Sequence, residues 1–234
     1  VRDLAYPLPV IVIAELLGVP PEDRERFKRW SDQLAVVLDP FSTGGDFGGV
    51  DDAFVESAEY FGRVFEERRA HPKGDLVSRL VAAEEGGARL SSIELLSVCV
   101  LLLGAGHETT TGLIGNAVIA LLRHPSEAAR LRAEPSLAPR AVEELLRFDS
   151  PVQMTDRVVL AEDLVLGGHA IRKGEQVVLM LGAANRDPDR WAAPDALDLG
   201  REDPRSLAFG HPAAKEYKVS MVLRDLTTLP LGVQ

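Results

Sequence analysis

One long apolar stretch dominates the pattern of hydrophobic and polar positions along the chain. It covers Ser91–Arg123, and a helix of that length extends roughly 45–50 Å at about 1.5 Å per residue. Ser91 and Glu94 have the spacing of a capping box, in which the serine oxygen and the glutamate carboxylate accept hydrogen bonds from free N–H groups at a helix start. Pro125 marks the end, because a proline pushes the preceding residue out of the α region. The stretch is apolar on nearly every side, so we expect this helix to be buried rather than amphipathic.

Small and polar residues interrupt the centre of this helix at Gly104–Thr111. A mid-helix glycine costs up to about 1 kcal/mol relative to alanine, and a threonine hydroxyl can bond the carbonyl four residues earlier and bend the axis. We therefore expect the helix to open locally and to leave room for a flat group against its backbone. A core helix with a simple kink is the alternative. The same interruption argues against a membrane span.

Hydrophobic residues at helical spacing predict shorter helices on both sides of the long one. In Asp51–Ala70 we expect Phe54, Ala58, Phe61 and Phe65 to face the core, while the charged run Glu66–Arg69 faces solvent. Proline and glycine positions set the ends of these segments. The predicted helices are Tyr6–Val19, Pro21–Leu38, Asp51–Ala70, Gly74–Glu85, Pro125–Ala133 and Ser136–Phe148.

From Pro151 onward the pattern changes to that of strands. Gly167-Gly168 lies between the short apolar runs Leu164–Leu166 and Ala170–Ile171, which predicts a hairpin. Turn-forming residues dominate Asn185–Asp195, so we expect an irregular segment there. The other predicted strands are Gln153–Leu160 and Val177–Met180.

Composition excludes several classes of protein. The chain has 234 residues, of which 46% are hydrophobic, and this is enough to bury a core. Its net charge is −10, and the sequence contains no cluster of basic residues. Nucleic acids and anionic membranes are therefore not expected partners, because both need clustered lysine and arginine. No signal peptide is evident at Val1, so we expect a cytoplasmic protein. The single cysteine, Cys99, cannot form an internal disulfide.

The central interruption carries a motif of a known family. Ala105-Gly106-His107-Glu108-Thr109, within a long apolar helix, resembles the A-G-x-[DE]-T signature of the cytochrome P-450 family. The resemblance implies a mainly α fold with a small β region, an incomplete P-450 fold built around one long central helix. It would form a single partial domain over residues 1–234, helical over 1–150 and β-rich with a meander over 151–234. The glycine-rich segment Pro40–Gly49 would lie between two helices that form a mobile lid over the substrate pocket.

By this resemblance the central helix lines an oxygen site. Thr109 would hold a water that donates protons to iron-bound oxygen, and Glu108 would connect that site to bulk solvent, which is general acid chemistry. Ala105 and Gly106 would lie against the cofactor, haem b. Glu108 and Thr109 are thus the expected catalytic residues.

Three further residues take their roles from the same resemblance. Glu144 and Arg147 lie on one helix face at i, i+3, and in the family such a pair is buried and ties its helix to the loop near the haem. A surface salt bridge worth roughly 0–1 kcal/mol is the alternative. Arg157 falls at the position that contacts a haem propionate, although an exposed strand arginine is the simpler interpretation of the residue alone.

Phe209-Gly210-His211 resembles the start of the family's haem-binding loop, F-G-x-G-x-[HR]-x-C-x-G, whose cysteine thiolate is the axial iron ligand. Phe209 and His211 would then contact the cofactor. The chain continues with Pro212–Lys215, so the second glycine, the basic residue and the cysteine are missing. We expect an internal deletion between His211 and Val219, because the ending resembles the family's C-terminus, and a fragment or trimmed chain that also lacks roughly the N-terminal third of the family.

No other residue is a good axial ligand. Cys99 lies ten residues before Thr109 on the same helix, roughly 15 Å along its axis, and we expect it to be a buried hydrophobic residue. A haem bound through His211 is conceivable. The remaining histidines have no metal-ligand spacing, so we predict no metal site.

The resemblance implies a soluble, bacterial-type monooxygenase. It would take electrons from a ferredoxin and its reductase and insert one oxygen atom into a lipophilic small molecule. Because the thiolate ligand is absent, we predict no activity for the chain as it stands. The alternative is a haem-free P-450-like scaffold that binds or activates a partner protein. A pseudogene-like product that melts without cooperativity is a third possibility, because one flank of the long helix would be an exposed apolar patch.

Overall fold

The computed structural model describes residues 3–35, 49–85, 90–160, 162, 164–207 and 217–218. The contacts divide the chain into two units, Val1–Thr111 and Gly112–Gln234. The predicted change from helical to β-rich structure at residue 150 lies inside the second unit, and a single domain over the whole chain stays a prediction. The predicted loop Pro40–Gly49 lies, except for Gly49, outside the described residues, as does its proposed role in a lid.

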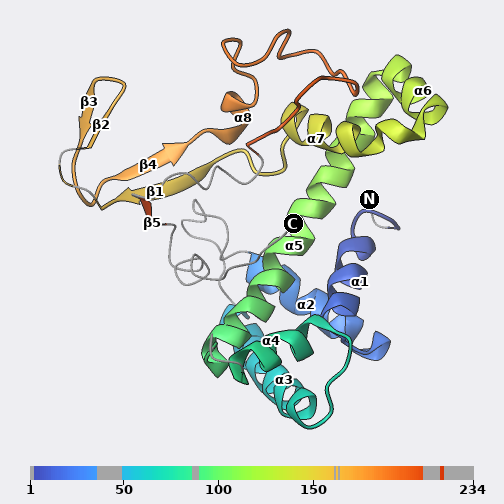
Figure 1. Ribbon diagram of the computed structural model, residues 1–234, viewed down its shortest axis with the longest axis vertical. Helices are drawn as coiled ribbons and strands as arrows, with labels where there is room; N and C mark the ends of the chain where they lie inside the picture. Colours follow the sequence, from blue (N-terminus) through green and yellow to red (C-terminus); the bar gives the residue numbers. More distant parts are fainter. Residues whose placement is uncertain are drawn as a thin grey trace. The chain divides into compact units, whose positions relative to one another are not determined.

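The first unit consists of helices (Figure 1). Hydrophobic periodicity predicted each of them, with ends that differ by a few residues. A short 3-10 turn at Pro21–Asp23 replaces the predicted start of the second helix. The helices are α1 (Pro7–Leu16), α2 (Arg24–Ala35), α3 (Val50–Ala70), α4 (Leu76–Glu85) and the first part of α5 (Ser92–Arg123).

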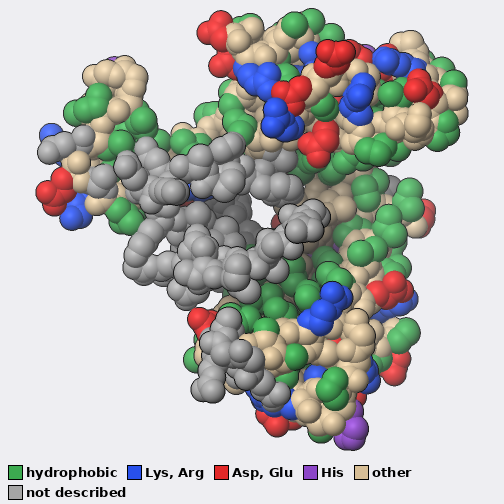
Figure 2. All heavy atoms as spheres, viewed as in Figure 1, with side chains coloured by type: hydrophobic (Ala, Val, Ile, Leu, Met, Phe, Trp, Pro, Cys, Tyr) green, Lys and Arg blue, Asp and Glu red, His purple; other side chains and the backbone are tan. Residues whose placement is uncertain are grey.

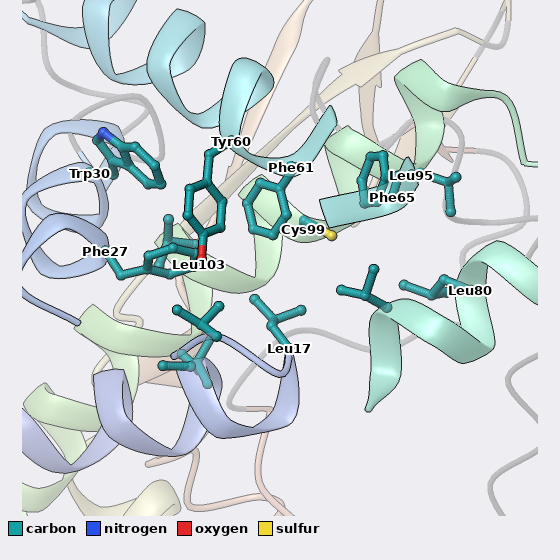
Figure 3. Close-up of a cluster of buried hydrophobic side chains, with 14 of the residues drawn as sticks. Leu17, Phe27, Trp30, Tyr60, Phe61, Phe65, Leu80, Leu95, Cys99 and Leu103 are labelled. Carbon is teal, nitrogen blue, oxygen red and sulfur yellow. The ribbon is translucent and has the colours of Figure 1, made fainter. Parts of the chain in front are cut away.

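Aromatic side chains from α2 and α3 form the centre of the core of this unit (Figure 3). The ring of Phe27 lies 5.2 Å from that of Trp30 and 5.7 Å from that of Phe61, centroid to centroid. These side chains are fully buried. Offset and edge-to-face aromatic pairs add roughly 0.5–1.5 kcal/mol each beyond the burial of their area.

The central helix contributes one stripe of buried residues to this core. Leu95, Cys99 and Leu103 are buried and lie four residues apart, on one face of α5. Most of the other residues of α5 are half-buried or exposed. The expectation that the helix is buried on nearly all sides is therefore wrong for the described structure, in which the other helices of the unit cover a single face. Cys99 is a buried hydrophobic residue, as predicted.

The expected local opening of α5 is absent. The helix is α-helical at every residue from Ser92 to Arg123, including Gly104–Thr111. Packing and the continuous hydrogen-bond ladder outweigh the modest cost of the glycines. By length and composition alone, α5 could cross a membrane, a test that the core helix of a soluble protein also passes. The argument against a span from its polar centre therefore stays a prediction.

The predicted capping box at the start of α5 is present. The backbone N–H and hydroxyl of Ser91 donate to Oε2 of Glu94 at 2.6 and 2.8 Å, and the N–H of Glu94 donates to the Ser91 oxygen at 3.3 Å. The backbone and hydroxyl donors of Ser91 lower the pKa of the Glu94 carboxyl below its ordinary value. Local sequence alone thus fixes where the helix begins.

Two predictions for α3 are wrong. Phe54 is 47% exposed, because the buried stripe of the helix runs instead through Ala53 and Ser57 toward Phe61. Arg68, predicted to be solvated, is buried. Its guanidinium is drawn inward by acceptors from elsewhere in the unit.

Arg68 joins three segments of the first unit. Its Nε donates to Oδ2 of Asp75 at 2.6 Å, and its Nη2 donates to the carbonyl oxygen of Gly18 at 3.0 Å. Gly18 has a φ of +70°, and a Cβ there would collide with the carboxylate of Asp75. Only glycine satisfies both conditions at this helix end. A buried arginine is tolerated because it is paired and hydrogen-bonded.

The second unit combines helices with small antiparallel sheets. Gly167 and Gly168 both have positive φ and connect β2 to β3, which confirms the predicted hairpin. The short helix α8 (Leu181–Ala184) was not predicted. Sheet order is β4-β1-β5 and, separately, β2-β3. The other elements are α6 (Pro125–Ala133), α7 (Ala138–Phe148), β1 (Thr155–Val159), β2 (Leu164–Leu166), β3 (His169–Ile171), β4 (Gln176–Leu179) and β5 (Tyr217–Lys218).

Candidate functional site

The predicted oxygen-side residues lie on a face of α5 that the core of the first unit does not use. Ala105 and Thr109 are four residues apart, and each is two residues, or about 200° of helix rotation, from the buried His107. They therefore point away from the buried stripe. The hydroxyl of Thr109 donates to the carbonyl oxygen of Ala105 at 2.7 Å, which leaves its lone pairs free to accept a hydrogen bond. Glu108 is exposed to solvent.

Gly106, which the resemblance predicts to lie against a cofactor, lies close to α1 in the described structure. A Cβ at this position would lie 2.8 Å from Cδ1 of Ile13, on α1. The missing side chain therefore allows α1 to approach the central helix closely. Contact of Gly106 with a cofactor stays a prediction, while its contact with α1 is a feature of the described structure.

His107, the variable position of the motif, is buried against α2. Its Nδ1 lies 3.0 Å from the Ser31 hydroxyl oxygen, and that hydroxyl donates to the carbonyl of Leu103 at 2.8 Å. Because the serine proton is already used, Nδ1 carries the proton that it donates to Ser31, which assigns the imidazole tautomer. Nε2 then has no hydrogen-bond partner among the described residues. The sequence analysis gave His107 no role, since its partners are on another helix.

Glu144 and Arg147 form a fully buried ion pair on α7. Nε and Nη2 of Arg147 donate to the two carboxylate oxygens of Glu144 at 2.7 and 2.9 Å. The remaining donor, Nη1, reaches the carbonyl oxygens of Asn185 and Pro194, both at 2.8 Å. A single i, i+3 pair thus holds the irregular segment after α8 against α7.

Arg201 completes this network and was missed by the sequence analysis. Its Nε donates to Oε2 of Glu144 at 3.0 Å, and its Nη1 to the carbonyl of Ala192 at 2.7 Å. The backbone N–H of Asp198 donates to the other oxygen of Glu144 at 3.1 Å. No periodicity marks Arg201, because its partner lies 57 residues earlier. Figure 2 shows further Lys, Arg, Asp and Glu side chains interspersed on the surface of this unit.

Arg157 lies half-buried on β1, opposite Val177 of β4. Its Nη1 donates to the carbonyl oxygen of Asp156 at 2.6 Å and to the hydroxyl oxygen of Thr155 at 3.0 Å. The guanidinium thus bonds to its own strand in the described structure, and its role toward a propionate stays a prediction. Phe209 and His211 lie outside the described residues.

The donors of the chain do not fit a thiolate-ligated haem. Cys99 is the single cysteine of the sequence, and burial raises the pKa of its thiol to about 12. It is packed in the core with Leu95 and Leu103, roughly 15 Å along the helix axis from Thr109. Among the described residues, no group of three or more His, Cys, Asp and Glu side chains could hold a metal ion.

The buried glutamate–arginine pair downstream of the motif-bearing helix agrees with the class of protein that the sequence motifs resemble. The chain belongs to the cytochrome P450 family, whose model, described as Cytochrome P450, matches residues 41–214. The resemblance inferred from the central helix is confirmed, as is the partial P450 fold. Members of this family are generally haem-containing monooxygenases.

Similar proteins come from bacteria. The chain is 43% identical over 90% of its length to the biotin biosynthesis cytochrome P450 of Bacillus subtilis, and 45% identical, also over 90%, to the vitamin D(3) 25-hydroxylase of Pseudonocardia autotrophica. It covers 53% and 51% of those proteins, so it spans about half the length of the curated relatives it matches. The crystal structure of P450BioI in complex with an acyl carrier protein ligated to hexadec-9Z-enoic acid matches 91% of this chain and 55% of that one, with a TM-score of 0.83 and 43% identity.

Proposed function

We propose that the chain is part of a haem-thiolate monooxygenase of bacterial, cytoplasmic type that inserts one atom of dioxygen into a lipophilic small molecule. Electrons would come from a ferredoxin and its reductase. The observation that carries the proposal is the face of α5 with Ala105 and Thr109, which the core of the first unit leaves uncovered. The relatives named for vitamin D(3) hydroxylation and for a complex with a fatty-acyl carrier protein support a lipophilic substrate.

In this proposal Thr109 and Glu108 manage protons. The Thr109 hydroxyl donates its hydrogen bond to the carbonyl oxygen of Ala105, so its lone pairs accept a hydrogen bond from a water and hold that water in place. Glu108, exposed beside it, exchanges protons with bulk solvent. Ala105 leaves space beside the hydroxyl, because its side chain is a single methyl group.

The chain as it stands is proposed to be inactive. The donor that makes the family's iron reactive is a cysteine thiolate, and Cys99 cannot supply it from the core of the first unit. The second candidate is a haem-free P450-like scaffold that binds or activates a partner protein. The lack of a suitable cysteine favours it, because such a scaffold needs the fold but not the iron.

A carbon monoxide difference spectrum tests the proposal. After addition of haem and dithionite, we expect this chain to give no thiolate-type band, while the biotin biosynthesis cytochrome P450 of Bacillus subtilis gives one under the same conditions. A thiolate-type band from this chain would overturn the inactivity. Absence of any Soret absorption after addition of haem, together with a cooperative melt, would favour the scaffold. A melt without cooperativity would exclude the scaffold and favour the pseudogene-like product.

Replacing each of two threonines of α5 by alanine distinguishes a functional role of Thr109 from a structural one. Thr109→Ala should change the free energy of unfolding by no more than about 0.5 kcal/mol, because its hydroxyl bonds only the carbonyl four residues earlier. Thr111→Ala should cost about 1 kcal/mol, since its hydroxyl donates at 3.0 Å to the carbonyl of Ala5, in a distant segment. Urea titrations followed by circular dichroism measure both. A Thr109→Ala variant as unstable as Thr111→Ala would indicate that Thr109 is a structural residue.

A further inference from the structure

Asn185 connects two parts of the second unit that are distant in sequence. It caps the end of α8, and its side chain is fully buried. Its Oδ1 accepts a hydrogen bond from the backbone N–H of Leu207 at 2.7 Å, and its carbonyl oxygen accepts one from Nη1 of Arg147 at 2.8 Å. The side chain of Asn185 therefore bonds to the backbone of Leu207, while its backbone carbonyl bonds to Arg147 of the buried ion pair.

Residues 205–207 have few other ties. Arg205 pairs with Asp203, only two residues away. The bond from Leu207 to Asn185 is the one hydrogen bond, within the described part of the chain, that joins this segment to residues more than two positions distant. An exposed ion pair such as that of Arg205 contributes little, because solvent screens it. The position of the segment consequently depends on the Asn185 amide.

A pocket lies on one side of this bond. A cavity of about 360 Å³ lies between the segment and the end of α8. Side chains that face a cavity lose contacts on that side, so packing holds them less firmly. A directional hydrogen bond to a buried amide is the remaining restraint. The residues lining the cavity are Ala184, Asn185, Arg190, Trp191, Arg205, Ser206 and Leu207.

We propose that Asn185 is a positioning residue that fixes the backbone of residues 205–207 on the buried Glu144–Arg147 pair. Leu207 precedes Phe209, the first residue of the predicted cofactor loop, by two positions. Asn185 thereby restrains the chain at Leu207, the last described residue before that loop. The meaning of this role for a cofactor rests on the proposed function, whereas the restraint itself does not.

The residue type follows from the geometry. An aliphatic side chain at position 185 would leave the N–H of Leu207 without its acceptor. An aspartate keeps an acceptor oxygen at the same reach but loses the Nδ2 donor, which has no partner among the described residues. Aspartate therefore retains the acceptor but buries a carboxylate, whereas alanine removes the acceptor.

Amide hydrogen exchange of the chain without added haem tests the proposal. In Asn185→Ala, we expect the Leu207 amide to exchange about fivefold faster, since a lost hydrogen bond is worth roughly 1 kcal/mol and a factor of ten corresponds to about 1.4 kcal/mol. The Asp198 amide, bonded to Glu144, should keep its rate. Asn185→Asp should protect the Leu207 amide better than Asn185→Ala. Asn116→Ala, which removes another side chain–backbone bond of the same unit, should leave the Leu207 amide unchanged.

Several results would overturn the proposal. An unchanged Leu207 rate in Asn185→Ala would exclude the restraint. Equal acceleration of the Leu207 and Asp198 amides would indicate that the whole unit is destabilised, so that Asn185 is structural only. If the alanine variant does not fold, Asn185→Ser replaces it, because its shorter side chain cannot reach the same acceptor position; an unchanged Leu207 rate in that variant would equally exclude the restraint. Because no haem is added, the outcome is independent of the carbon monoxide experiment.

Discussion

Replacement of Arg147 by alanine is expected to destabilise the second unit by about 3–5 kcal/mol, because it leaves the carboxylate of Glu144 buried with a weakened set of partners. The variant also loses the bonds from Nη1 to the carbonyl oxygens of Asn185 and Pro194. A loss of this size is a large fraction of the roughly 5–15 kcal/mol by which an ordinary domain is stable. We therefore expect the second unit of this variant to unfold at a much lower urea concentration than in the wild type.

Urea denaturation with Trp191 as the reporter measures this effect. The chain has two tryptophans, and Trp191 lies in the second unit, with the Arg147 guanidinium 5.4 Å from its ring. Arg190→Ala is the matched control, since this guanidinium lies 4.4 Å from the same ring but its side chain is 54% exposed. Its cost should stay below about 1 kcal/mol. Similar urea midpoints for the two variants would show that the buried pair contributes no more to the free energy of unfolding than the exposed Arg190.

Replacement of Phe61 by alanine should destabilise the first unit by about 3–5 kcal/mol, through lost burial and the cavity left behind. Phe61 is fully buried and contacts the rings of Phe27, Tyr60 and Phe65. These aromatic contacts form the centre of the core, so no flexible neighbour can fill the space.

Phe54 on the same helix provides the control for this variant. Its side chain is 47% exposed, so Phe54→Ala should cost well under half as much as Phe61→Ala. Trp30, whose ring lies 5.2 Å from that of Phe27, reports on unfolding of the first unit by fluorescence. If Phe54→Ala were the more damaging variant, the arrangement of α3 described here would be wrong.

The sequence predicted helix positions well, because periodicity, caps and prolines are local signals. The capping box of Ser91 and Glu94 sets the start of α5 within a few residues of sequence. Phe54 was misplaced because hydrophobic size was used as the guide to burial. Small residues such as Ala53 and Ser57 occupy the side where helices approach closely. Arg68 was misplaced because its acceptors, Gly18 and Asp75, lie on other segments.

The candidate site could be predicted only in part. The motif on α5 and the Glu144–Arg147 pair are short-range patterns, so a resemblance can identify them. Arg201 and Asn185 belong to the same network, but their partners are separated by 57 and 38 residues. No periodicity in the sequence joins such residues. The burial of α5 was overestimated for a related reason. Hydropathy indicates that a helix is apolar but does not indicate which of its faces other described elements cover.

The location of Cys99 has a consequence for how this protein can be observed. Its sulfur is the single thiol of the sequence, lies beneath α3 and α4 in the first core cluster, and is held as the unreactive protonated form. A thiol-modifying reagent can act only when that core opens. The rate of covalent labelling of Cys99 therefore measures how often the core of the first unit opens, without any engineered probe.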